Sequence, residues 1–110
     1  MSQQQQLLKQ ELTVSQILST YGKQFKQIQL QYSDGLNGRC AMGVIMSYFG
    51  WNGKDDSSAA TKLLAALIAL RHERIDKDLL IDLNDTGYTF DEIADYLDRT
   101  DELTNLNIER

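Results

Sequence analysis

Apolar residues recur three and four positions apart along most of the chain, which is the pattern of helices that bury one face. The first helix is predicted over residues 14–21, because Thr13 followed three residues later by Gln16 fits a capping box. The long alanine- and leucine-rich helix is predicted to begin at Asp56 or Ser57, either of which can cap it. The later helices are predicted over about residues 39–49, 56–72, 76–83, 90–97 and 101–108, and the apolar run at 79–81 leaves a strand as the alternative for 76–83.

The segments between these helices carry strand and turn signals. Residues 27–32 alternate apolar and polar with a period of two, which suits a short strand or an extended connection. Asp-Gly and Asn-Gly pairs predict a turn over residues 33–38, and residues 84–87 are predicted to form a loop. The pattern as a whole predicts an all-α fold: a single compact domain of five or six short helices over residues 13–110, after a frayed, glutamine-rich N-terminus at residues 1–12.

Residues 87–110 are predicted to form a helix pair. Thr89 and Glu92 make the clearest capping box of the chain, and the helix that they open places four apolar residues on one face: Phe90, Ile93, Ala94 and Leu97. A short last helix is predicted to begin at Asp101, after a turn.

This predicted helix pair holds the whole net charge of −5. Residues 90–110 contain seven acidic and two basic residues, whereas the first 89 residues contain nine of each. Such a surface favours a protein partner with a basic surface. The residues expected to contact it are Asp98, Asp101, Glu102, Asn105 and Glu109.

Composition places the chain among ordinary globular domains, because 42% of its 110 residues are apolar and 25% are charged. The longest apolar run, residues 63–70, is far shorter than the ~20 residues that cross a bilayer. The N-terminus lacks the cationic head and apolar stretch of a secretory signal, and one cysteine cannot form an internal disulfide. We therefore expect a cytoplasmic protein without membrane association.

The lone cysteine supports two interpretations. Cys40 is predicted at a helix start beside Arg39, and both features favour a thiolate. His72, with Asn84 and Asp85 to orient it, would complete a Cys-His-Asn arrangement, and the protein would then be a small cysteine-dependent hydrolase or transferase.

The other interpretation makes Cys40 a packing residue, and the pattern of small residues favours it. Four small residues share one side of the helix: Cys40, Gly43, Ser47 and Gly50. The following helix offers a matching set in Ala59, Ala66 and Ala69, so the two backbones are predicted to approach closely. Trp51 is predicted to close the core, whereas exposure of Trp51 and Tyr48 together would favour a homodimer.

No metal or cofactor site is predicted. One cysteine and one histidine do not make a zinc site, the acidic residues at 76–85 lack the spacing of a calcium loop, and no glycine-rich phosphate loop precedes a helix.

The C-terminal segment resembles the helix-turn-helix of bacterial regulators and of sigma-factor C-terminal domains. The matching positions are Gly87, Thr89, Glu92, Ile93, Ala94, Leu97 and Thr100. The resemblance implies a DNA-associated regulator, but the residues of the would-be recognition helix are acidic where a DNA reader needs lysine or arginine. Nucleic-acid binding is therefore disfavoured.

A second resemblance covers about residues 36–98. Cys40-Ala41-Met42-Gly43, Leu83-Asn84-Asp85 and Glu92-Ile93-Ala94 resemble the motifs of a group of small uncharacterised helical proteins of bacteria and their phages. It implies one compact helical unit of phage or mobile-element origin and carries no activity. The function expected from the sequence is a non-enzymatic protein–protein interaction module that uses the acidic C-terminal surface.

Overall fold

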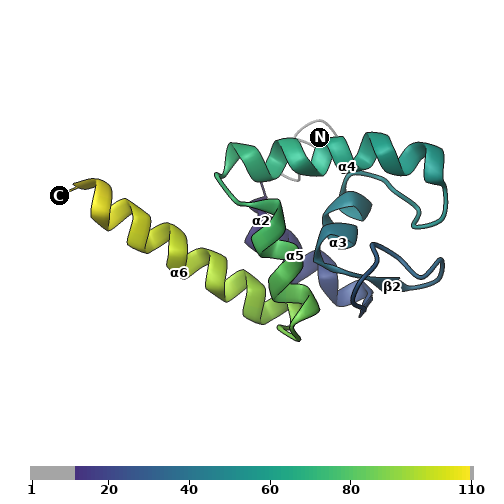
Figure 1. Ribbon diagram of the computed structural model, residues 1–110, viewed down its shortest axis with the longest axis horizontal. Helices are drawn as coiled ribbons and strands as arrows, with labels where there is room; N and C mark the ends of the chain where they lie inside the picture. The colour runs from purple at the N-terminus through teal and green to yellow at the C-terminus, as the bar shows by residue number, and fades with distance from the viewer. Residues whose placement is uncertain (1–11, 110) are drawn as a thin grey trace, which may run out of the picture.

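The computed structural model describes the backbone of residues 12–109 and the side chains of residues 12–99 (Figure 1). Within these residues the chain is mostly helical, as predicted. The helical elements are α2 (Val14–Thr20), the 3₁₀ turn η1 (Tyr21–Gln24), α3 (Ala41–Tyr48), α4 (Asp56–His72), α5 (Lys77–Asp85) and α6 (Phe90–Glu109). The predicted N-terminal segment 1–12 lies outside the described residues, except for Leu12, which packs partly buried against the core.

Local capping explains where these helices begin. Both predicted capping boxes are present: Thr13 exchanges bonds with Gln16 at the start of α2, and Thr89 exchanges bonds with Glu92 at the start of α6. Asp55 caps α4 by accepting from the Ser57 amide, so the cap lies one residue before the predicted ones.

A two-stranded parallel sheet is the part of the fold that the all-α prediction lacks. Strand β1 (Lys26–Gln27) pairs with β2 (Gly38–Arg39), directly before α3. Between them the chain turns back through Leu30, whose φ is +71°, and through Asp34, whose carboxylate accepts from the Leu36 and Gly38 amides. The extended segment predicted at 27–32 is therefore a strand only at its first residue.

Helix α3 is the centre of the core, and all eight of its residues are buried. It packs against α2, α4 and α5. The largest fully buried side chains include Ile17, Leu18, Met42, Ile45, Met46, Leu80 and Ile93. Figure 1 shows α4 along one edge of the molecule and the far half of α6 projecting away from the other elements.

The predicted C-terminal helix pair is wrong, because α6 is one continuous helix of 20 residues. The expected turn fails to form since the turn glycine of a helix-turn-helix is replaced by Asp98, and nothing between residues 90 and 109 is glycine or proline. An ion pair of 3.2 Å between Asp95 and Arg99, one turn apart, also lies at the expected break.

Candidate functional site

The sequence-predicted catalytic candidates come together in part, at the start of α3. An open groove of about 460 Å³ lies there between the end of α5 and the segment that follows β1. Its lining residues are Leu30, Gln31, Tyr32, Cys40, Ile81 and Asp85. Asn84 lies beside the groove and is buried.

Cys40 is the N-cap residue of α3, and its surroundings do not favour a thiolate. Its Sγ accepts a bond from the Gly43 amide at 3.4 Å, and the residue is only 5% exposed. Burial raises the pKa of the Cys40 thiol, which outweighs the opposite effect of the helix-start amides. The expectation of a lowered pKa at a helix start is therefore wrong for this residue, because desolvation is the larger effect.

Arg39 does not contact the thiol, although it precedes Cys40 in sequence. Successive residues of an extended segment point to opposite sides, and Arg39 turns away into the protein. Its guanidinium lies over the Phe25 ring at 4.6 Å and donates to Ser47 Oγ at 2.8 Å. It also donates to three main-chain carbonyls, those of Leu36, Gly38 and Asn52. Arg39 therefore fastens two loops to α3, a role that nothing in the local sequence indicates.

His72 is exposed, and it is the last residue of α4. It lies near the beginning of α5, whereas Cys40 lies against the end of that helix. The nine residues of α5 span about 13 Å. The structure thus brings Cys40, Asn84 and Asp85 together and leaves His72 out.

Asn84 is 1% exposed and uses both ends of its amide. Its Oδ1 accepts from the Ala41 amide at 3.0 Å and from Gln27 Nε2 at 2.8 Å, and its Nδ2 donates to the Ile28 carbonyl at 2.8 Å. It belongs to the last turn of α5, not to the predicted loop. Asn84 therefore joins the end of α5 to residues 27–28 and to the start of α3. We call this set of hydrogen bonds the Asn84 clasp.

Asp85 and Gln27 extend this clasp. Asp85 Oδ1 accepts from the Leu30 amide at 3.0 Å, which holds Leu30 in its left-handed conformation with the side chain 86% exposed. Gln27 Oε1 accepts from the Phe90 amide at 3.0 Å, so the same network reaches the first turn of α6. The contacts of Asn84 and Asp85 are those of structural residues.

The small side of α3 does allow a close backbone approach, but the partner differs from the predicted one. A Cβ at Gly43 would collide with the carbonyl oxygen of Tyr32, in the segment between the strands. Ser47, on the same side, binds Arg39. Helix α4 still packs on α3 through Ala66 and Leu70, which are both buried. Gly43 and Ser47 of α3 thus contact the loop and Arg39, and Ala66 is the one of the three predicted alanines that is fully buried.

Trp51 is buried as predicted, and Tyr48 at the end of α3 is buried too. Trp51 is 7% exposed and donates from its indole nitrogen to the Asp55 carbonyl at 3.0 Å. Tyr48 is 7% exposed and packs edge-on against Tyr21 and Phe49. The joint exposure that would have favoured a homodimer through these two residues is not found.

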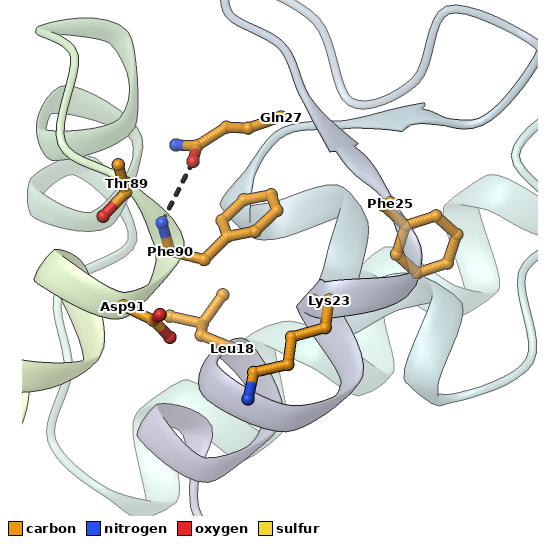
Figure 2. Close-up of a pocket in the computed structure, with 8 residues that line it drawn as sticks. Leu18, Lys23, Phe25, Gln27, Thr89, Phe90 and Asp91 are labelled. Carbon is orange, nitrogen blue, oxygen red and sulfur yellow. Dashed lines mark hydrogen bonds between the residues drawn. The ribbon is translucent and has the colours of Figure 1, made fainter.

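A second hollow, of about 230 Å³, lies between η1 and the first turn of α6 (Figure 2). Leu18, Phe25 and Phe90 give it an apolar lining, and the Gln27–Phe90 bond crosses one side of it. Lys23 and Asp91 stand at its rim with opposite charges. The hollow is smaller than the ~300 Å³ at which ligand pockets begin.

The acidic residues of α6 are described as far as residue 99. Asp98 accepts a 2.6 Å bond from Ser15 Oγ, so it ties α6 to α2, and Asp91, Glu92 and Asp95 are exposed. The side chains of Asp101, Glu102, Asn105 and Glu109 lie outside the described residues.

Among residues 12–99, no three histidine, cysteine or acidic side chains lie close enough to hold a metal ion. In the described part of the chain, no helix has the length and apolar character needed to span a bilayer. Comparison with known protein families, with curated proteins and with solved structures found no match to this chain.

Proposed function

We propose that this protein is a non-enzymatic interaction module whose helix α6 presents an acidic surface to a protein with a basic surface. The observation that carries the proposal is the division of α6 into two halves. Its first turns are anchored by an apolar stripe of Phe90, Ile93, Ala94 and Leu97, all buried. The remaining turns extend away from the other elements (Figure 1).

A projecting helix of this kind is suited to recognition. α6 has 20 residues and is therefore about 30 Å long, and its backbone continues well beyond Leu97, the last of its buried residues that the structure describes. Four of the residues from 98 onward are acidic: Asp98, Asp101, Glu102 and Glu109. A run of like charges along a helix attracts an oppositely charged partner and raises its association rate.

The two alternative functions have less support. A thiol enzyme needs an ionised nucleophile with a base in reach, whereas Cys40 is buried and His72 lies beyond the other end of α5. A DNA reader needs basic residues, whereas α6 is acidic and lacks the turn that would set off a recognition helix.

The test is affinity capture with the immobilised full chain, comparing wild type with Asp101→Lys/Glu102→Lys. We expect recovery of the bound proteins, measured by quantitative mass spectrometry, to fall about tenfold or more, with the lost proteins being basic. Circular dichroism should show the same helix content in both chains.

The matched control is Asp78→Lys/Asp82→Lys, which changes the net charge by the same amount on the exposed surface of α5. The ion pair that this control removes, between Asp78 and Lys77 at 3.9 Å, is exposed and contributes little to the free energy of unfolding. Equal recovery by all three proteins would contradict the proposal. A gel shift on random duplex DNA and native-state alkylation of Cys40 with iodoacetamide test the two alternatives.

A further inference from the structure

Helix α4 has an apolar outer face that the rest of the described chain does not cover. Only Ala66 and Leu70 of its 17 residues are fully buried, and the helix lies along the edge of the molecule (Figure 1). On the opposite side Leu64 is 59% exposed and Ile68 is 61% exposed. These two residues are four positions apart, so they adjoin on one face.

Leu64 is the middle residue of α4. Eight residues precede Leu64 in the helix and eight follow it. When two copies of α4 lie antiparallel across a twofold axis at Leu64, Ala60 of each copy meets Ile68 of the other. A small residue then faces a large one on both sides of the axis, as interdigitating helices require.

The charges at the two ends of α4 are also complementary in this arrangement. Asp55 and Asp56 lie at its beginning, and Arg71 lies in its last turn, followed by Arg74. The antiparallel register places Arg71 opposite Ser57, next to Asp56 in the first turn, and places His72 opposite Asp56. Antiparallel helices also oppose their macrodipoles favourably.

The other charged groups near this face do not oppose the arrangement. Glu73 is turned toward α2, where its carboxylate accepts from the Val14 amide at 2.9 Å. The Lys62 ammonium lies beside Gly50, on the side of α4 that faces the end of α3. Lys54 is exposed and precedes the helix.

We infer that the outer face of α4 binds a second copy of this chain, in an antiparallel symmetric dimer centred on Leu64. One helix face is at the small end of specific interfaces, so the dimer should dissociate at micromolar concentrations. The inference is independent of the role proposed for α6, because it uses a different surface.

The test is sedimentation equilibrium of the full chain from about 1 to 500 µM, where the mass should rise from 12.5 kDa toward twice that value. Leu64→Lys should raise the dissociation constant about tenfold or more, because it places two cations at the axis. Leu36→Lys is the matched control: Leu36 is 76% exposed in a loop, and its replacement should leave the constant unchanged.

A charge exchange tests the register. Asp56→Arg and Arg71→Asp should each weaken the dimer about three- to tenfold, since every contact occurs twice. The double variant should restore the constant to within about threefold of wild type. A monomer at all concentrations, as would result if another protein or another segment covered the face, would overturn the inference. So would a dimer insensitive to Leu64→Lys, or a double variant no tighter than the single ones.

Discussion

Replacing Asn84 with alanine should destabilise the whole domain, because Asn84 is a structural residue. Its amide satisfies groups on α3, on β1 and on the connection after β1, and it is 1% exposed. Asn84→Ala therefore removes the shared partner of two segments, residues 27–28 and the start of α3, that both lie far from Asn84 in sequence.

The magnitude follows from the groups that lose their partners. The Ala41 amide and the Ile28 carbonyl are left without Asn84, whereas Gln27 Nε2 keeps its 2.6 Å bond to the Tyr88 carbonyl. Each orphaned buried group costs about 1 to 3 kcal/mol. We expect the free energy of unfolding to fall by about 2 to 5 kcal/mol, which is a large part of the ~5 to 15 kcal/mol typical of a domain.

Urea denaturation followed by circular dichroism measures this change, with Asn52→Ala as the control. Asn52 makes a similar number of bonds, to the Lys54 and Asp55 amides, but it is exposed and water can replace it. Its loss should cost less than about 1 kcal/mol. Hydrogen exchange at the Ala41 amide should also accelerate in Asn84→Ala. Equal destabilisation by the two variants, or unchanged exchange at Ala41, would refute the clasp as the source of stability.

Three further changes test other contacts of the core. Gly43→Ala gains about 1 kcal/mol of helix propensity but drives a methyl group into the Tyr32 carbonyl, so urea denaturation should show net destabilisation of about 1 to 2 kcal/mol; a more stable variant would contradict the close approach. Arg39→Lys keeps the charge but loses most of the fork that binds Ser47 and the loop carbonyls, so it should cost about 2 to 4 kcal/mol in the same assay, and a cost below about 1 kcal/mol would refute its fastening role. The thiol of Cys40 has a raised pKa in the folded protein, so the unfolded chain loses its proton first and stability should decline as pH rises above about 8.5. Unfolding curves between about pH 7.5 and 9.5 should show this decline in wild type and a smaller one in Cys40→Ala; equal slopes would contradict it.

Local signals made the helix starts predictable from sequence. A capping box needs only four consecutive residues, so Thr13 and Thr89 could be recognised without knowledge of the fold. The apolar spacing likewise predicted the buried stripe of α6. Both features depend on neighbours within one or two turns.

The clasp could not be predicted, because its contacts join distant segments. Asn84 is 57 residues from Gln27 and 43 residues from Ala41. As a turn former it predicted a loop, whereas its bonds hold it in the last turn of α5. The partner of Gly43 was missed for the same reason: the Tyr32 carbonyl comes close to α3 where it accepts from the Cys40 amide at 3.2 Å, in a loop whose course the sequence did not show.

We expect that the folded chain needs neither of the two surfaces proposed for binding. More than half of the surface of Leu64 and of Ile68 is exposed to solvent. Polar residues at these two positions would therefore leave the core unchanged and would make the protein more soluble. A single exposed leucine such as Leu36 is ordinary on a protein surface, whereas Leu64 and Ile68 adjoin and together form an apolar patch near the centre of α4. Substitutions at this patch and at residues 101 and 102 should therefore change association while leaving the free energy of unfolding of the dilute monomer within about 0.5 kcal/mol of wild type. Changes in the Asn84 clasp should lower the free energy of unfolding without acting on either binding surface. The two kinds of variant therefore distinguish residues that bind from residues that hold the fold together.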